Sequence, residues 1–207
     1  MKILSATTVR NEGPYLLEWI AWHQAIGVTD FIVHSNDCDD GSNLLLDRLA
    51  EHGVLVHEAN QPPADRSIQW NALNAAWKHP LRKAADWMLI SDLDEFPVIH
   101  TAEGRLTDLI AALPEKTDAV ALPWRLFGAN SLIAIDGRPV VEQFTRCAPP
   151  VMMHPISATF FKSLFRPAAF ARPGVYRPRH RKEAAPVWAD GSGRVLPPVM
   201  ADNDKRL

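Results

Sequence analysis

Short apolar runs, separated by longer amphipathic segments, dominate the first 123 residues of the chain. The runs are rich in β-branched and aromatic side chains and are flanked by turn-forming residues, a pattern typical of strands. We therefore expect strands at Ile3–Val9, Phe31–Val33, Val54–Val56, Trp87–Ser91 and Ala119–Pro123.

Between these runs, apolar side chains recur every three or four positions, which predicts helices that bury one face. In the first such segment Leu16, Trp19, Ile20 and His23 follow this spacing, and Gly27 ends the pattern. By the same argument we expect helices over residues 15–26, 42–50, 65–79 and 106–113.

This alternation of strands and helices predicts an α/β fold, with a mostly parallel sheet flanked by helices. After Val140 the pattern changes to short strands and proline-containing loops, so we expect a small antiparallel C-terminal part. Residues 184–207 show little apolar periodicity. We therefore expect a single domain over residues 1–183, followed by a tail or an incomplete C-terminal element.

The charge of the chain is unevenly distributed, although its composition is ordinary for a globular protein. Hydrophobic residues make up 47% of the 207 positions, charged residues 22%, and the net charge is −2. No acidic residue lies between Glu142 and Glu183. This basic stretch suits an anionic ligand or a charged membrane surface, or it is simply a solvated face. Its basic residues are Arg146, Lys162, Arg166, Arg172, Arg177, Arg179, Arg181 and Lys182.

Several features predict a cytoplasmic protein. Cys38 and Cys147 are too few for a disulfide framework. Arg10 and Glu12 arrive before the core of a signal peptide could form, and no apolar run approaches the roughly 18 residues that span a bilayer. We expect no integral insertion, but contact with the inner face of a membrane through the basic C-terminal third remains open.

Polar clusters follow three of the predicted strands, at Arg10–Glu12, Asn36–Gly41 and Asp92–Glu95. Ligands of open parallel sheets bind outside the carboxyl ends of the strands, so we expect these clusters to meet at one edge. Asp92 and Asp94 are hard oxygen ligands, typical of a Mg²⁺ or Mn²⁺ ion that also binds phosphate. No glycine-rich phosphate loop is present, so the metal and basic side chains would have to meet the phosphate charge.

Each cluster also has a purely structural interpretation, which for Asp92 and Asp94 is a role in a turn. Asp37 and Asp40 are good turn formers, and Asn11–Glu12 could do no more than begin a helix. A lone histidine such as His180 is more often structural than a ligand. Trp124–Arg125, after the fifth predicted strand, is either a packing aromatic with a solvated arginine or a surface for sugar and phosphate.

Five motifs in the same order resemble the glycosyltransferase family 2 group, in the branch related to family 92, which has the nucleotide-sugar-binding GT-A (Rossmann-like) architecture. The match covers roughly residues 1 to 180. The motifs are Val9-Arg10-Asn11-Glu12, Asn36-Asp37-Cys38-Asp39-Asp40-Gly41-Ser42, Asp92-Leu93-Asp94-Glu95-Phe96, Trp124-Arg125-Leu126-Phe127-Gly128 and Lys162-Ser163-Leu164-Phe165-Arg166-Pro167.

The resemblance implies a nucleotide site built from the first two motifs. Asn11 and Glu12 would lie near the base, and Asp37 and Asp40 near the base and ribose. Cys38 replaces the usual serine of the second motif. The acceptor-side segment that follows in the family is not evident before Leu207.

The resemblance also implies a metal site, in which Asp92 and Asp94 hold Mn²⁺ or Mg²⁺ against the diphosphate. His180 corresponds to the late histidine that completes metal binding in many GT-A enzymes. A metal ion stabilises a leaving diphosphate as a Lewis acid, and Arg166 or Arg179 would add to that stabilisation.

We therefore expect a metal-dependent, inverting glycosyltransferase that uses a UDP- or GDP-sugar and a glycan or lipid-linked acceptor hydroxyl. Glu95 and Glu142 are the candidates for the general base, and the sequence does not choose between them. Three alternatives are a non-catalytic nucleotide-sugar-binding module, an aspartate-dependent phosphatase and a nucleotidyltransferase. The basic residues form no known nucleic-acid-binding module, so no nucleic-acid partner is expected.

Overall fold

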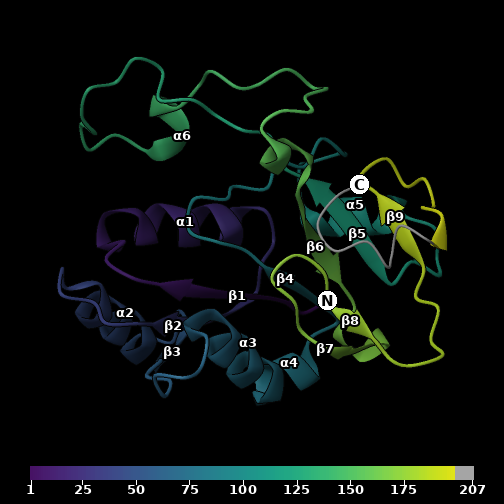
Figure 1. Cartoon of the computed structure of the whole chain (residues 1–207), viewed down its shortest axis with the longest axis horizontal. Helices are drawn as coiled ribbons and strands as arrows, with labels where there is room; N and C mark the ends of the chain where they lie inside the picture. Colours follow the sequence, from purple (N-terminus) through teal and green to yellow (C-terminus); the bar gives the residue numbers. More distant parts are fainter. Residues whose placement is uncertain (199–207) are drawn as a thin grey trace.

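The computed structural model describes residues 1–198, and a seven-stranded sheet forms its centre (Figure 1). The strand order across the sheet is β3-β2-β1-β4-β6-β5-β9. In chain order these strands are β1 (Ile3–Val9), β2 (Asp30–Ser35), β3 (Val56–Ala59), β4 (Trp87–Ile90), β5 (Ala119–Pro123), β6 (Phe161–Phe165) and β9 (Trp188–Asp190).

The sheet is mixed but mostly parallel, as the sequence predicts. β1 pairs in parallel with β2 and β4, β2 pairs in parallel with β3, and β5 with β9. β6 lies between β4 and β5 and is antiparallel to both. A second sheet of two antiparallel strands, β7 (Phe170–Arg172) and β8 (Arg179–His180), provides the expected antiparallel C-terminal part.

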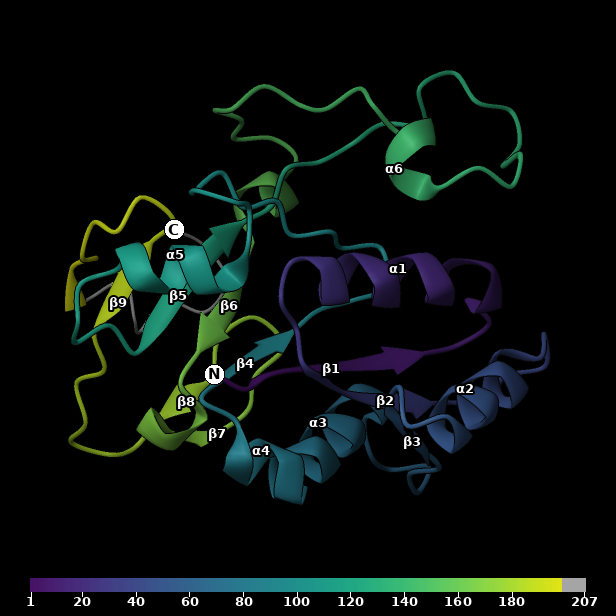
Figure 2. The ribbon, with the colours of Figure 1, turned by 180° about the vertical axis from the view of Figure 1, so that it is seen from behind.

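Helices cover both faces of the sheet (Figures 1 and 2). Because strand side chains alternate between faces, Ile3 and Leu89 pack with α1, α2 and α5, whereas Leu4 and Met88 pack with α3. The helices are α1 (Gly13–Ala25), α2 (Ser42–Glu51), α3 (Ile68–Lys78), α4 (Pro80–Ala84), α5 (Leu106–Ala112) and α6 (Val140–Gln143), with two short 3₁₀ helices, η1 (Ile156–Thr159) and η2 (Pro167–Ala169).

Several predicted boundaries differ from the structure, most clearly those of the third strand and the third helix. The third strand begins at Val56 and continues to Ala59, two residues later than the apolar run. The expected helix over 65–79 begins only at Ile68, where the Ser67 hydroxyl accepts a hydrogen bond from the Trp70 amide, and a separate helix follows from Pro80. Side-chain capping and proline geometry, rather than apolar spacing, set these ends.

Part of the predicted C-terminal tail belongs to the main sheet. β9 lies beyond residue 183, pairs with β5, and buries Trp188 against Phe161 and Phe170. A three-residue strand is too short to give a periodic signal, so the sequence could not reveal it. The domain boundary at 183 otherwise stays a prediction, and residues 199–207 lie outside the described part of the chain.

Residues 124–160, here called the arch, form a long excursion between β5 and β6 that passes above α1 (Figures 1 and 2). Its two limbs are joined at the base by an isolated antiparallel bridge between Phe127 and Cys147. At its far end the Glu18 carboxylate of α1 accepts hydrogen bonds from the amides of Val140 (2.6 Å) and Val141 (3.1 Å). The arch is therefore attached to the body at both ends. Within residues 1–198 no helix is both long and apolar enough to cross a membrane.

His23 predicts a pH-dependent stability. Its ring is fully buried against Trp19, and burial lowers its pKa to about 4. The unfolded chain therefore takes up a proton near pH 6.5 that the folded chain resists, so stability is lost as the pH falls from about 6.5 to about 4. We expect this group alone to cost about 3 kcal/mol over that range.

Urea unfolding of the wild type and of His23→Asn at several pH values isolates this contribution. Asparagine keeps a donor for the Trp19 carbonyl, which His23 Nδ1 contacts at 2.8 Å, but it does not titrate. The stability difference between the two proteins should shrink toward pH 4. An unchanged difference would mean that His23 is not the titrating group.

Candidate active site

The first two polar clusters are joined by reciprocal hydrogen bonds. Asn11, in a left-handed conformation with φ 56°, donates from Nδ2 to the Asp39 carboxylate at 2.6 Å. The Asp39 amide donates in return to Asn11 Oδ1 at 2.9 Å. The loops after β1 and β2 are therefore one unit at the carboxyl edge of the sheet, as predicted.

Asp40 and Ser42 connect this unit to the starts of α1 and α2. The Asp40 carboxylate accepts hydrogen bonds from the Ser42 hydroxyl, the Ser42 amide and the Gly13 amide, and those from Ser42 chiefly lower its pKa. Ser42 Oγ in turn accepts from the Glu12 amide at 3.1 Å. A Cβ at Gly13 would lie 3.2 Å from Ser42 Oγ, so glycine suits this junction. Asp40 thus has a structural task besides its predicted nucleotide contact.

Asp37 projects from the same loop and is exposed. Its backbone is left-handed, with φ 45°, and its carboxylate accepts a hydrogen bond from the side chain of the buried Asn36 at 3.0 Å. The position beside a strand end is the one expected of a nucleotide contact, and the contact itself stays a prediction.

The loop after β4 is fastened to α1 through its backbone. Trp19 Nε1–H donates to the Asp92 carbonyl at 3.0 Å, and Trp22 Nε1–H donates to the Pro97 carbonyl at 2.9 Å. Phe96 packs edge-on against Trp22. The aromatic face of α1 therefore fixes the backbone of the aspartate loop, which leaves its carboxylates available to other partners.

Glu95 closes the turn that carries the two aspartates. Its Oε2 accepts hydrogen bonds from the Asp92 amide at 2.8 Å and the Ser91 hydroxyl at 3.3 Å. Burial raises the pKa of Glu95 to about 7, and the neighbouring carboxylates of Asp92 and Asp94 add to that rise. Geometry gives Glu95 a positioning role in this turn. Its pKa also suits a proton acceptor near neutral pH.

Lys162 is the site residue that sequence reasoning missed. It lies on β6 with a side chain only 5% exposed, and its Nζ lies 2.9 Å from Asp92 Oδ2 and 3.4 Å from Glu95 Oε2. A buried ammonium is costly without such partners, so this contact is built into the fold. A lysine between the apolar residues of Phe160–Phe165 is the signal that could have indicated it.

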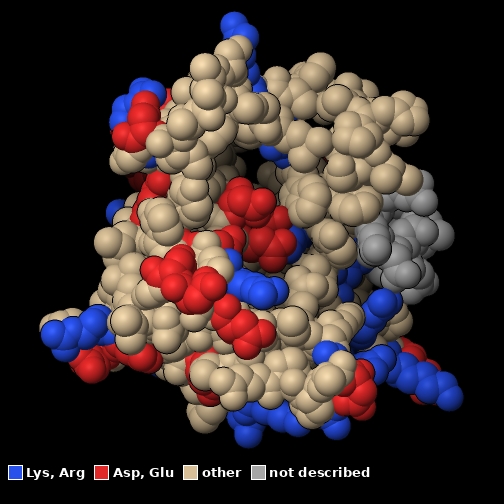
Figure 3. Space-filling model, turned by 60° about the vertical axis from the view of Figure 1, so that its left-hand side comes forward, with Lys and Arg blue, Asp and Glu red and all other residues tan. Residues whose placement is uncertain are grey.

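Asp94 is the exposed carboxylate of the turn after β4. Burial raises the pKa of the nearby Glu12, and the charges of Asp94, Asp92 and Asp40 raise it further. Glu12, Asp40, Asp92 and Asp94 therefore lie within electrostatic reach of one another at this edge of the sheet. In Figure 3, where this edge comes forward, acidic side chains gather in the middle of the face below a hollow. Such a concentration of negative charge favours a cation.

The structure does not assemble the predicted three-ligand metal set. His180 lies in β8, paired with Phe170 of β7, and its Nδ1 contacts the Arg181 carbonyl at 3.0 Å. Among residues 1–198 no three His, Cys, Asp or Glu side chains form a group that could hold a metal ion. The C-terminal strands turn away after β6, which separates His180 from Asp92 and Asp94.

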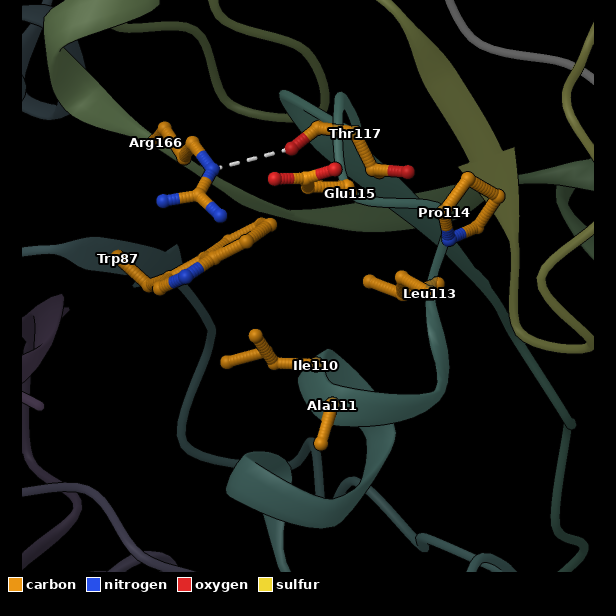
Figure 4. A pocket seen from close by; sticks show the side chains of 8 residues that line it. All are labelled: Trp87, Ile110, Ala111, Leu113, Pro114, Glu115, Thr117 and Arg166. Atoms are coloured by element: carbon orange, nitrogen blue, oxygen red, sulfur yellow. Dashed lines mark hydrogen bonds between the residues drawn. The ribbon is translucent and has the colours of Figure 1, made fainter.

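Arg166 lies at the opposite edge of the sheet, contrary to its predicted place beside the diphosphate. Because β6 is antiparallel to β4, Phe165 lies opposite Met88, near the start of β4, whereas Asp92 follows its end. Arg166 stacks on the Trp87 ring and donates from Nε to the Thr117 carbonyl at 3.0 Å. It lines a cavity of about 260 Å³ with Glu115 and Leu113 (Figure 4).

This placement predicts that Arg166→Gln leaves nucleotide-sugar binding unchanged. The variant should lose about 1 kcal/mol of unfolding free energy, since a hydrogen bond and a stacking contact disappear. Calorimetric titration and urea unfolding measure the two effects separately. Weakened nucleotide-sugar binding with unchanged stability would restore Arg166 to the site.

Of the predicted site residues on the arch, some lie close to Lys162 and others lie far from the aspartate pair. Trp124 lies at its base in an aromatic cluster with Phe160 and Tyr176, and the Lys162 ammonium lies 5.5 Å from the Tyr176 ring centroid. Arg125 follows on the surface. Glu142 is exposed on α6, which lies above α1 in both ribbon views, whereas β4 lies below it (Figures 1 and 2). The structure therefore does not bring Glu142 to the aspartate pair.

Comparison with known proteins decides the family, because residues 7–188 match the glycosyltransferase family 92 domain. The chain belongs to glycosyltransferase family 92. The match extends from β1 into β9 and so includes Asp92, Asp94 and Lys162.

Individual relatives are more distant. A family 92 protein of rice (Oryza sativa subsp. japonica) is 29% identical over 93 residues, which cover 44% of this chain and 15% of the rice protein. A family 92 protein of castor bean (Ricinus communis) is 27% identical over 99 residues, which cover 46% of this chain and 16% of the castor-bean protein. The chain thus spans only a small part of the length of these curated relatives.

Among solved structures, the S. aureus TarS fragment 1–349 superposes with a TM-score of 0.51 at 16% identity, covering 82% of this chain and 48% of that fragment. TarS is a GT-A glycosyltransferase, so the predicted GT-A architecture is confirmed. The likeness concerns the fold alone.

Proposed function

We propose that the chain is a metal-dependent glycosyltransferase that moves a sugar from a nucleotide-diphosphate sugar to a hydroxyl of a glycan or lipid-linked acceptor. The observation that carries the proposal is the exposed Asp94 carboxylate beside Asp92, whose own carboxylate is fixed by the buried Lys162. Family membership supports the reaction class, and the resemblance described above implies inversion of the anomeric carbon.

Asp92 and Asp94 fit a Mn²⁺ or Mg²⁺ ion. Mg²⁺ in phosphate-transferring sites is held by one or two carboxylates and completes its coordination with phosphate oxygens and water. Asp94 is exposed, and the side chain of Asp92 is 42% exposed despite its ion pair, so both can present an oxygen to the edge. A bound ion would stabilise the negative charge that develops on the leaving diphosphate.

The chain's own residues would orient the donor. Lys162 and Glu95 hold the Asp92 turn in one geometry, and Asn11 and Glu12 lie at the neighbouring strand end for the nucleotide base. The aromatic cluster around Trp124 lies beside Lys162, where aromatic faces can pack on a sugar ring. Arg125, exposed at the same base, would meet phosphate.

The acceptor hydroxyl needs a proton acceptor, and Glu95 is the stronger of the two predicted residues. It lies within the aspartate turn with a pKa near 7, whereas Glu142 lies on α6. As a proton acceptor, Glu95 would use Oε1, which is buried and has no hydrogen-bond partner among the described residues.

A nucleotide-sugar-binding module without transfer is the second candidate. The Glu95 side chain is only 15% exposed, and its Oε2 accepts a hydrogen bond from the Asp92 amide. No freely exposed base therefore lies beside Asp94. Such a module would bind the donor through the same carboxylates but would not release the nucleoside diphosphate.

Incubating the protein with a panel of UDP- and GDP-sugars and Mn²⁺ separates these candidates. Metal-dependent release of the nucleoside diphosphate, accelerated by a hydroxyl acceptor, is the expected result. Binding without release would favour the module. Release of phosphate from simple phosphomonoesters, with no affinity for nucleotide sugars, would contradict both and indicate a phosphatase.

A further inference from the structure

Exposed apolar side chains are concentrated on the arch. Half of the large hydrophobic residues exposed on residues 1–198 lie on it. Monomeric proteins rarely expose such a concentration of apolar surface unless it meets a partner or a membrane. The arch residues are Phe127, Ile133, Ile135, Val141, Val151, Met153 and Ile156.

The exposure is greatest in the two limbs of the arch, which carry no charge. Residues 126–135 and 147–160 contain no Asp, Glu, Lys or Arg. Within these limbs Ile133 is 103% exposed, Val151 85% and Met153 67%. In Figure 3 the upper part of the molecule, where the arch lies, is mostly uncharged, apart from a basic side chain that projects at its top and a basic and acidic group at its upper left.

The arch is held in place rather than left as a free loop. Gln143 is buried, donates to the Arg138 carbonyl and accepts from the Asp136 amide, and Asn130 donates to the Gln143 carbonyl. Together with the Glu18 contacts to α6, these bonds present the apolar side chains outward on a fixed frame. A fixed apolar projection loses little conformational entropy when it is covered.

Cations flank the uncharged limbs. The Gly128 amide donates to the Arg146 carbonyl and the Ala148 amide to the Leu126 carbonyl, which places the exposed Arg146 opposite Gly128, with the exposed Arg125 three residues before Gly128 on the facing limb. Of the two acids in the arch, Asp136 is paired with Arg138, and Glu142 lies on α6. Uncharged apolar side chains beside basic ones match a bilayer with anionic headgroups.

We propose that the arch is a membrane-contact surface, with the apolar side chains of its two limbs entering the interface and Arg146 meeting anionic lipid headgroups. The contact stands independently of transfer activity. Because the arch begins at Trp124 of the candidate site, it would also bring a lipid-linked acceptor to that site, an implication that rests on the proposed function.

Co-sedimentation with phosphatidylcholine vesicles, with and without phosphatidylglycerol, tests the contact. The full chain should bind the anionic vesicles more strongly, and a triple variant (Ile133→Ser, Val151→Ser, Met153→Ser) should lose about tenfold or more of that binding. The matched control, Leu44→Ser with Val195→Ser, removes exposed apolar residues elsewhere and should bind as the wild type does. Arg146→Gln should reduce only the preference for anionic vesicles.

Three results would overturn the proposal. One is the absence of binding to either vesicle type, and another is binding that the triple variant retains in full. The third is concentration-dependent association of the wild type that the triple variant lacks, without vesicle binding, which would assign the arch to a protein interface. Nucleotide-sugar binding measured on the same triple variant should be unchanged, so failure here and failure of the proposed function are distinguishable.

Discussion

Asp94→Asn should abolish Mn²⁺-dependent binding of a nucleotide sugar. The change keeps the size of the side chain but removes the charge of the one exposed carboxylate in the Asp92–Glu95 turn. Loss of an outer partner of a metal ligand typically costs 10–100-fold in affinity, so loss of a proposed ligand should cost about a hundredfold or more. Calorimetric titration of the nucleotide sugar, with and without Mn²⁺, measures the loss.

Glu115→Gln is the matched control for this variant. It removes the same charge from an exposed carboxylate at the opposite edge of the sheet, beside Arg166 (Figure 4). It should bind the donor and the metal as the wild type does. If both variants weakened binding equally, the effect would come from net charge rather than from a site at Asp94.

Lys162→Met should destabilise the protein by about 3 kcal/mol, because removing one partner leaves the other charges of a buried ion pair uncompensated. Methionine preserves most of the volume, so little of the loss comes from packing. The same variant should bind the donor more weakly, since Asp92 loses the ammonium that holds it at 2.9 Å. Urea unfolding and donor titration measure the two effects.

The loss of unfolding free energy in Lys162→Met should grow with pH. Burial raises the pKa of Glu95 to about 7, and Lys162 opposes that rise. Without the ammonium, the pKa of Glu95 rises further. A carboxyl with a raised pKa contributes stability at low pH that is lost as the pH rises through that pKa. The unfolding free energy of the variant should therefore be closest to that of the wild type below pH 7. Above pH 7 the difference between the two should grow.

Lys116→Met, an exposed lysine at the other edge, should change neither stability nor binding. Lys162→Arg keeps a cation and should recover part of the stability. A Lys162→Met protein as stable as the wild type at all pH values would show that the ion pairs with Asp92 and Glu95 contribute nothing to folding.

The sequence predicted those parts of the fold that depend on local patterns. β1 and β5 have the predicted bounds, and the carboxylates at 92 and 94 follow a buried strand, because apolar periodicity and turn residues report on neighbours along the chain. The convergence of the first two clusters followed from a general property of parallel sheets, and the bonds between Asn11 and Asp39 bear it out.

Lys162 and Arg166 show where such reasoning ends. Both belong to one basic stretch, but they stand four residues apart on or just after β6, which separates them by roughly 13 Å along a strand. Only the direction of β6 decides which one reaches Asp92, and the antiparallel pairing with β4 selects Lys162. No local pattern encodes that pairing. His180 and Glu142 lie away from the aspartate pair for the same reason, because tertiary contacts set the geometry of the β7–β8 hairpin and of the arch.

The binding of Mn²⁺ in the presence and absence of UDP or GDP tests the central claim most directly. Free Mn²⁺ can be followed by electron paramagnetic resonance for the wild type, Asp94→Asn and Arg166→Gln. We expect the nucleoside diphosphate to tighten Mn²⁺ binding to the wild type and to Arg166→Gln by about tenfold or more, and not to Asp94→Asn. Equal Mn²⁺ binding by all three proteins, with no effect of either diphosphate, would contradict a metal–diphosphate site at Asp92 and Asp94.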